Sequence, residues 1–142
     1  MKRSVVREPI VIVGGGIGGL SAVIALARQG YGVKLVERTS QFTEIGAGLQ
    51  VGPNGYKMLD RLGLSKKAAR VAVFPRELTM MDSISGEMVT TIPTGEEFVK
   101  RFHYPYSLIH RADLQAVLLK ACLAEARINV LTGCTVKRFS PS

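Results

Sequence analysis

The chain has 142 residues, of which 46% are hydrophobic and 21% charged, a mixture typical of globular proteins that excludes disordered and fibrous classes. The formal net charge is +8, but no basic run of five or six residues occurs, so the charge does not predict a nucleic-acid partner. No apolar stretch approaches the roughly 20 residues that span a bilayer. These properties predict one soluble, cytoplasmic domain with no membrane span.

The first 37 residues predict a β–α–β unit. Residues 9–13 are apolar and rich in β-branched side chains, which is typical of a strand buried on both faces of a sheet. Apolar positions then recur at helical spacing up to a stop at Gly30. These positions are Leu20, Val23, Ile24 and Ala27. A second apolar strand is expected at residues 33–36, directly before Glu37.

The remaining elements are predicted to be shorter. After a loop through residue 48, helices are expected after Pro53 and after Ser65, a candidate N-cap. Two β-type runs between residues 78 and 92 flank Ser85 and Gly86, which is typical of a hairpin. Strands are also expected at residues 107–109, 128–131 and 135–139. A helix is expected at residues 112–126, with an apolar stripe of Leu114, Val117, Leu118, Ala121 and Leu123.

The turn between the first strand and the first helix reads GGGIGG, a GxGxxG fingerprint in its full structural context. Gly14 permits the tight turn, and Gly16 allows a pyrophosphate to approach the backbone. Gly19 allows close packing of the helix on the strand. The amides of Ile17 and Gly18, at the positive end of the helix dipole, would face the phosphates.

The acidic residue after the second strand completes this fingerprint. Glu37 would accept hydrogen bonds from ribose hydroxyls, which favours FAD or NAD over a cofactor with a 2′-phosphate. Arg38 is either a neighbour of the adenosine or an ordinary exposed arginine. The sequence therefore predicts an α/β, Rossmann-like FAD/NAD(P)-binding domain. A stand-alone NAD-binding module and a basic domain that binds nucleic acid remain as alternatives.

Four later segments resemble the single-component flavoprotein aromatic hydroxylases. They read IGAGLQVGPN at residues 45–54, MMD at 80–82, IPTGE at 92–96 and YPYSLIHRADL at 104–114. Within that family the similarity is to the 3-hydroxybenzoate 6-hydroxylase and salicylate hydroxylase branch, and it extends from about residue 8 to residue 139. The resemblance implies a flavoprotein fold of the glutathione-reductase type, with FAD as cofactor and NAD(P)H as co-substrate. It also implies a small aromatic acid as substrate, hydroxylated with O₂.

The resemblance adds further candidate cofactor-binding residues. Arg111 would contact the flavin cofactor, and the backbone of Val136 would hold the adenine. The loop that would run toward the isoalloxazine consists of Gly46, Ala47, Gly48 and Leu49. No catalytic residue and no metal ligand is predicted within this chain. Cys122 and Cys134 are expected to be buried thiols, because their spacing suits neither a zinc site nor a redox pair.

The resemblance also implies a domain division. Residues 1–76 would form the first part of the FAD-binding domain, residues 77–106 the start of the substrate-domain sheet, and residues 107–142 a return to the FAD-binding domain. The fold would then be incomplete, and the chain the N-terminal portion of a longer hydroxylase, inactive by itself. The hairpin at residues 78–92, without the rest of its sheet, would present an apolar edge through which the chain can associate.

Overall fold

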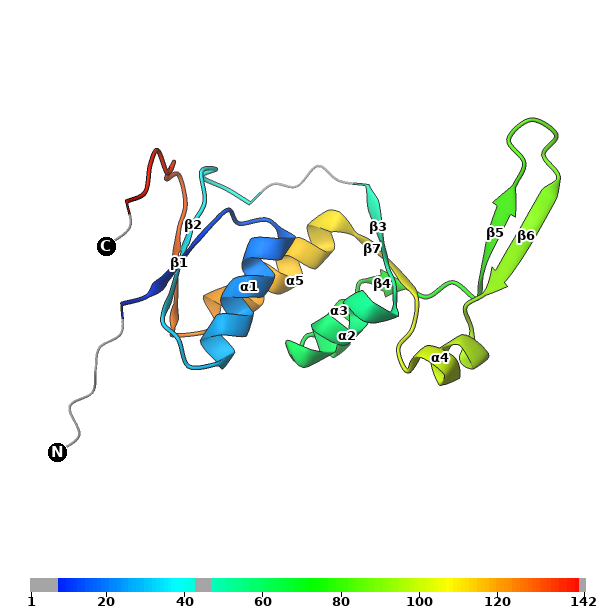
Figure 1. Cartoon of the computed structure of the whole chain (residues 1–142), viewed down its shortest axis with the longest axis horizontal. Helices are drawn as coiled ribbons and strands as arrows, with labels where there is room; N and C mark the ends of the chain where they lie inside the picture. The colour runs from blue at the N-terminus through cyan, green and yellow to red at the C-terminus, as the bar shows by residue number, and fades with distance from the viewer. Residues whose placement is uncertain (1–7, 43–46, 141–142) are drawn as a thin grey trace. The chain divides into compact units, whose positions relative to one another are not determined.

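The structure is a computed structural model that describes residues 8–42 and 47–140 (Figure 1). The chain divides into two compact units. Unit 1 comprises Met1–Ile45 together with Leu114–Ser142, and unit 2 comprises Gly46–Asp113. Unit 1 is therefore discontinuous in sequence, and unit 2 is inserted into it.

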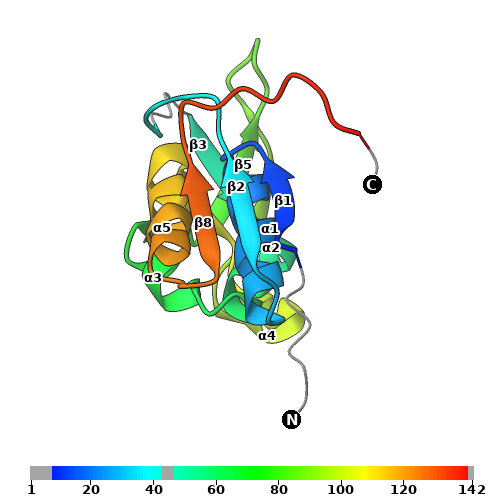
Figure 2. The same cartoon turned by 90° about the vertical axis from the view of Figure 1, so that its left-hand side faces the viewer.

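Unit 1 is a three-stranded parallel sheet with two helices on one face, as Figure 2 shows. The strands lie in the order β1 (Ile10–Val13), β2 (Val33–Val36), β8 (Ile128–Leu131). The helices are α1 (Ile17–Arg28) and α5 (Arg111–Leu123), whose first turn still belongs to unit 2. This arrangement confirms the predicted β–α–β unit and the predicted strand at residues 128–131.

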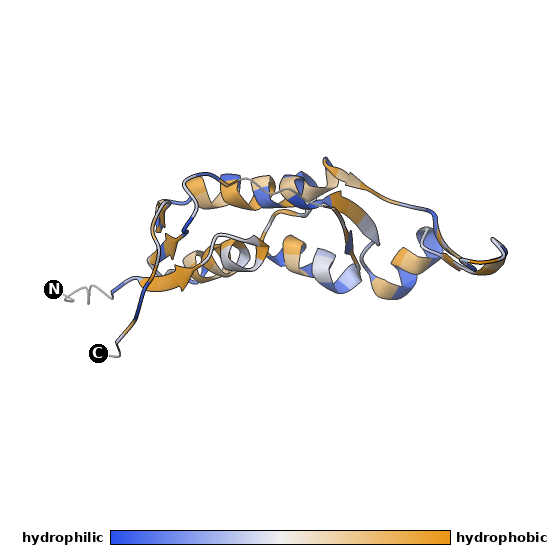
Figure 3. Ribbon diagram, turned by 90° about the horizontal axis from the view of Figure 1, so that it is seen from above, coloured by the Kyte–Doolittle hydropathy of each residue, from blue (hydrophilic) through white to orange (hydrophobic). Residues whose placement is uncertain are grey.

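The core of unit 1 lies between α1, α5 and the inner face of the sheet. All four apolar positions predicted for α1 are buried. The core residues with at most 1% exposure are Leu20, Val23, Ala27, Val33, Leu35, Leu118 and Cys122. Burial of one such leucine or valine side chain stabilises the fold by about 1.5–3 kcal/mol. The helical ribbons in Figure 3 alternate between apolar and polar segments, as expected of helices with one buried side.

The opposite face of this sheet differs from the prediction. Val11 and Val13 of β1 are 55% and 63% exposed, so β1 is buried on one face rather than on both. The physical reason is that α1 and α5 cover one face, while none of the described residues covers the other. The strand expected at residues 135–139 is also wrong, because this stretch is irregular and pairs with no strand among the described residues.

Unit 2 is built around a three-stranded antiparallel sheet. In it β7 (Ser107–His110) lies between β3 (Gly48–Val51) and β4 (Ala72–Val73). The helices α2 (Pro53–Arg61) and α3 (Ser65–Ala69) follow β3. The buried apolar residues of this unit are Tyr56, Leu59, Leu64, Ala68 and Ile109. The Tyr56 hydroxyl donates to the Ser65 carbonyl at 3.1 Å, and burial raises the pKa of that hydroxyl.

Unit 2 also contains the predicted hairpin. Strands β5 (Glu77–Met81) and β6 (Met88–Pro93) pair antiparallel, followed by the short helix α4 (Glu96–Phe102). The turn is closed by Asp82, whose carboxylate accepts from the backbone N–H groups of Ile84 and Ser85 at 2.9 and 2.7 Å. The exposed apolar side chains of the hairpin are Met80, Met81, Ile84, Met88, Val89 and Ile92.

Several other predictions need correction. The two predicted helices begin at Pro53 and at Ser65, but the N-cap of α3 is Leu64, and the Ser65 hydroxyl instead donates to Asp60 at 2.7 Å. The predicted loop ends before residue 48, where a strand that was not expected covers residues 48–51, and β4 and α4 were not expected either. Helix α5 covers Arg111–Leu123 instead of the predicted residues 112–126. Leu123, which was predicted to lie in the apolar stripe of this helix, is 68% exposed, whereas the polar residue Gln115 is buried. No described helix has the length and apolarity needed to cross a membrane.

Candidate functional site

The glycine-rich turn joins β1 to α1. Gly14 has φ of +99°, in the left-handed region that favours glycine, and its N–H donates to the Val36 carbonyl at 2.8 Å. A Cβ on Gly19 would collide with the Gly14 carbonyl, whereas a Cβ on Gly16 would meet open space. Only a glycine at position 19 therefore lets α1 pack this closely on the turn, and the backbone at Gly16 is accessible.

The start of α1 presents unpaired backbone donors. Gly16 is the N-cap and has no side chain to cap the helix, and the first turn holds no acidic residue. The N–H groups of Gly16, Ile17 and Gly18 have no hydrogen-bond partner among the described residues. Helix N-termini with free N–H groups bind anions, because the donors and the helix dipole both favour negative charge.

Glu37 lies at the end of β2 and holds the turn. One carboxylate oxygen, Oε2, accepts from the Gly15 N–H at 2.6 Å, and the other, Oε1, accepts from the N–H and hydroxyl of Thr39 at 2.8 and 2.9 Å. The N–H groups of Thr39 and then Gly15 lower the pKa of this carboxyl below its usual 4.5. The side chain is therefore a carboxylate at neutral pH.

A polar cleft of about 220 Å³ opens beside the turn. It is lined by Gly15, Gly16, Glu37, Arg38, Thr39, Phe42 and Gln115. The side-chain amide of Gln115, which is 6% exposed, donates through Nε2 to the Gly15 carbonyl at 3.2 Å. The Phe42 ring lies against Gly15, where it would collide with an added Cβ. The residues of this cleft come from the turn before α1, from α5 and from the segment after β2.

A second, more apolar cleft of about 300 Å³ lies at the carboxyl ends of β1 and β2. Its lining residues are Val13, Gly14, Val36, Glu37, Arg38, Cys134, Thr135 and Val136. The segment after β8 is fixed to the site by two backbone bonds, from Gly133 to the Thr39 carbonyl and from Cys134 to the Glu37 carbonyl, both 2.9 Å. Cys134 is exposed, which corrects the expectation that both thiols are buried.

The two clefts fit the adenosine diphosphate half of a dinucleotide. Both are lined by Glu37 and Arg38. Free N–H groups at the start of α1 suit a pyrophosphate, the carboxylate suits ribose hydroxyls, and the apolar cleft beside Val136 suits a purine ring. Arg38 is exposed and makes no ion pair with any residue of the described ranges.

The structure also brings together some of the residues predicted for the flavin end, all in unit 2. The β3–β7 register places Gly48 opposite His110 and Leu49 opposite Ile109. The backbone N–H of Arg111 consequently donates to the Ala47 carbonyl at 3.4 Å. Gly46 lies outside the described residues. The roles of this group in cofactor binding stay predictions.

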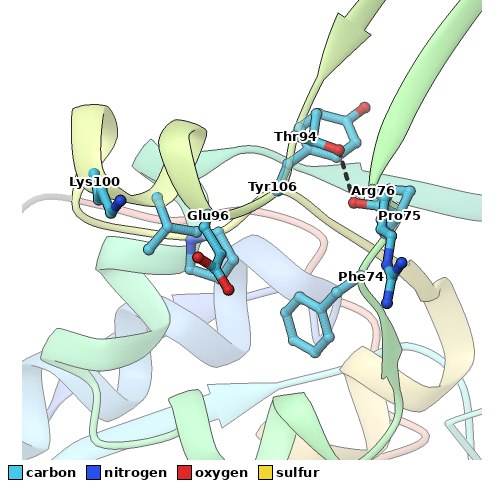
Figure 4. Close-up of a pocket in the computed structure, with 10 residues that line it drawn as sticks. Phe74, Pro75, Arg76, Thr94, Glu96, Lys100 and Tyr106 are labelled. Atoms are coloured by element: carbon cyan, nitrogen blue, oxygen red, sulfur yellow. Dashed lines mark hydrogen bonds between the residues drawn. The ribbon is translucent and has the colours of Figure 1, made fainter.

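Unit 2 holds a further cavity of about 500 Å³, shown in Figure 4. Its walls include Phe74, Arg76, Val99 and Tyr106, and the Thr94 hydroxyl donates across one side to the Pro75 carbonyl at 2.7 Å. None of the predicted cofactor-binding residues lines it. Across the part of the chain that the structure describes, no three His, Cys, Asp or Glu side chains gather as metal ligands would.

Eight residues outside the predicted set line the two clefts, namely Val13, Gly15, Val36, Thr39, Phe42, Gln115, Cys134 and Thr135. A polar residue at a helix position next to the apolar stripe was the one available signal for Gln115. For Thr39 and Phe42 no such signal exists, because their roles follow from the path of the chain after β2. Gly15 stands between two other glycines in the turn, so the sequence alone does not distinguish its role from theirs.

Comparison with known proteins agrees with this geometry. The family model described as "FAD binding domain" matches residues 7–133. The 3-hydroxybenzoate 6-hydroxylase of Polaromonas naphthalenivorans is 44% identical over 131 residues, which are 92% of this chain and 33% of that protein. The 3-hydroxybenzoate 6-hydroxylase of Klebsiella oxytoca is also 44% identical, over 89% of this chain and 32% of that protein.

A similarity of fold extends to solved structures. The p-nitrophenol 4-monooxygenase PnpA of Pseudomonas putida superposes with a TM-score of 0.86 and 21% identity, over 95% of this chain and 34% of that one. This chain thus spans about a third of the length of the curated relatives it matches. Because the family match covers most of the chain, the protein belongs to the FAD binding domain family.

Proposed function

We propose that unit 1 binds the adenosine diphosphate half of FAD. The observation that carries this proposal is the row of free N–H groups at Gly16, Ile17 and Gly18, next to the ionised carboxylate of Glu37. The N–H groups bind the pyrophosphate, and the carboxylate accepts hydrogen bonds from the ribose hydroxyls. The backbone of Val136 contacts the adenine in the apolar cleft, with Arg38 at its rim.

The flavin end of the cofactor is assigned to unit 2. Arg111 contacts the cofactor there, and the segment of Gly46, Ala47, Gly48 and Leu49 runs along the isoalloxazine. Support comes from the sequence resemblance and from the hydrogen bond that joins Arg111 to Ala47. Two glycines in that segment allow a flat ring to approach the backbone closely.

For a full-length protein that contains this sequence, the proposed activity is the hydroxylation of a small aromatic acid. Relatives at 44% identity are named 3-hydroxybenzoate 6-hydroxylases, which supports an acid of the 3-hydroxybenzoate or salicylate type. FAD, reduced by NAD(P)H, supplies the chemistry with O₂, and the protein supplies binding and orientation. We assign no catalytic acid or base to this chain.

Titration of the chain with FAD, ADP and NADH tests the cofactor. Isothermal calorimetry should detect FAD and ADP, and competition between them should be complete because they share unit 1. A Glu37→Ala variant should weaken both by about tenfold, the effect of lost hydrogen bonds to a charged group in a partly buried site. If NADH binds and FAD does not, the protein is instead an NAD-binding module.

Oxygen uptake tests the proposal about activity. With FAD, NADH or NADPH, and 3-hydroxybenzoate or salicylate, the 142-residue chain should consume no more O₂ than free flavin does. Hydroxylated product formed by the chain alone would show that the catalytic groups lie within it, and would contradict the proposal that this chain holds no catalytic acid or base.

Three further properties complete the proposal. The two free thiols support a reducing compartment such as the cytoplasm. The exposed apolar residues of the hairpin support association through its edge. The net charge of +8 is not gathered into a basic block, so nucleic acid is not a partner; salt-dependent retention on DNA in a gel-shift assay would contradict this.

A further inference from the structure

We propose that Gln115 is a positioning residue of the phosphate-binding turn, and that it and Glu37 together fix the two peptide planes on either side of Gly15. This inference rests on the proposed binding of FAD in unit 1. Gln115 lies on α5, about 100 positions along the chain from the turn, and its side-chain amide donates to the Gly15 carbonyl. Nothing in the fingerprint itself specifies this partner.

The glycines leave the turn underdetermined. Residues 14, 15 and 16 are all glycine, and without a Cβ each adopts positive and negative φ about equally well. A peptide plane between two glycines can therefore rotate at little steric cost, and such a rotation exchanges the directions of its N–H and its C=O. Since the turn binds phosphate through N–H groups, something other than the glycines has to select the correct orientation.

Glu37 selects the first plane. The Gly15 N–H points to its carboxylate at 2.6 Å. All described peptides are trans, so the carbonyl of the same plane, that of Gly14, points the opposite way. The crowding of that carbonyl against Gly19 agrees with this direction.

Gln115 selects the second plane. Its Nε2 donates to the Gly15 carbonyl at 3.2 Å, in a buried position. The N–H of the same plane belongs to Gly16 and points away from Gln115, and it has no partner among the described residues. The amide of Gln115 thus keeps the Gly16 N–H available as a phosphate donor.

The chemistry of glutamine suits this place. A neutral amide donates to the carbonyl without pairing with Glu37, which lines the same cleft together with Arg38. A lysine or arginine at position 115 would compete with the Gly15 N–H for the Glu37 carboxylate. An ionised glutamate there would have no hydrogen to donate, and its oxygens would face the Gly15 carbonyl oxygen. Burial of Gln115 among core residues of α5 makes the hydrogen bond worth more than at the surface.

The test compares three variants of the full 142-residue chain by calorimetric titration with ADP. Gln115→Met keeps the length and packing of the side chain but removes the donor, and it should weaken ADP binding by about tenfold. Gln115→Glu should bind poorly at pH 8 and regain affinity toward pH 5, as its carboxyl becomes protonated and donates to Gly15. Gln29→Met, at an exposed glutamine after α1, should bind ADP as the wild type does.

A second readout does not depend on the ligand. Amide hydrogen exchange at Gly15, followed by NMR without ADP, should be faster by about tenfold in Gln115→Met. The reason is that rotation of the Gly15–Gly16 peptide plane also weakens the hydrogen bond from the Gly15 N–H to Glu37. Should the wild type fail to bind ADP and FAD, the proposed function fails, while this exchange still tests the role of Gln115. The role is overturned if Gln115→Met exchanges and binds like the wild type, or if Gln115→Glu lacks the recovery at low pH. Should Gln115→Met not fold, the pH profile of Gln115→Glu decides.

Discussion

Replacement of Glu37 by glutamine tests how the turn is held. The carboxylate receives donors on both oxygens, Gly15 on one side and Thr39 on the other. A carboxamide of the same shape accepts on one side only, so its NH₂ group must face a donor whichever way it is turned. The Glu37→Gln variant should therefore lose more than one hydrogen bond, and both rotamers of the amide should be poor.

The expected loss is about 2 kcal/mol. Hydrogen bonds to charged groups contribute about 1.5–3 kcal/mol in favourable positions, and the short bond from Gly15 is partly buried. The two bonds from Thr39 are exposed, so solvent screening leaves them worth a few tenths each. A loss of this size lowers Tm by about 10 °C in a domain of fewer than 100 residues.

Thermal and urea unfolding of the chain at pH 7 and at pH 3 provide the measurement. Because folding lowers the pKa of Glu37, its contribution is present above about pH 4.5 and is lost as the pH falls through the lower folded value. The difference between wild type and Glu37→Gln should therefore shrink at pH 3. Glu97→Gln, at an exposed ion pair with Lys100, is the control and should change stability by less than about 0.5 kcal/mol. A Glu37→Gln variant as stable as that control, or an equal loss at both pH values, would falsify the reasoning.

Three other outcomes follow from the structure. Gly19→Ala should destabilise unit 1 by about 2 kcal/mol or more in thermal unfolding, because its Cβ would collide with the backbone carbonyl of Gly14. Gly18→Ala is the control, since its Cβ would meet open space, and its stability should be unchanged or higher by about 0.5–1 kcal/mol. Cys134, which is exposed in the apolar cleft, should react with a thiol reagent in the native chain, and ADP should protect it. Cys122 is buried and its pKa is raised to about 11, so it should react only when the chain unfolds. Equal labelling of both thiols in the native chain would contradict this difference in burial. Met80→Lys should reduce self-association in sedimentation experiments at unchanged Tm, and undiminished association would exclude the hairpin edge.

The fingerprint at residues 14–37 was predictable because its signals are local. A β-branched run, glycines at fixed spacing and an acidic residue after the next strand all act within one β–α–β unit. The hairpin was predictable for the same reason, since its strands are adjacent in sequence. In contrast, β3 and β4 are short and exist because each pairs with β7, and no local pattern records such pairing.

The exposed side of β1 and the role of Gln115 could not be predicted for a different reason. Whether Val11 is buried depends on what covers the sheet, and its own residue type is the same in either case. Gln115 breaks an apolar helix pattern, but its partner is the backbone of Gly15, about 100 positions away. The irregular course of residues 135–139 likewise reflects the lack of a neighbouring strand among the described residues rather than weak β propensity.

The insertion of unit 2 into unit 1 has a consequence for the order of folding. Strand β2 must find β8, and residues 37–127 lie between them, so closing that loop as a flexible chain costs about 4 kcal/mol of entropy. If unit 2 folds first, the hydrogen bond between Ala47 and Arg111 already holds its two ends together. The remaining loop then behaves as a much shorter one, and the closure cost falls by about 1 kcal/mol. The clefts around Glu37 would then be the last part of the chain to form, because the segment after β8 completes them.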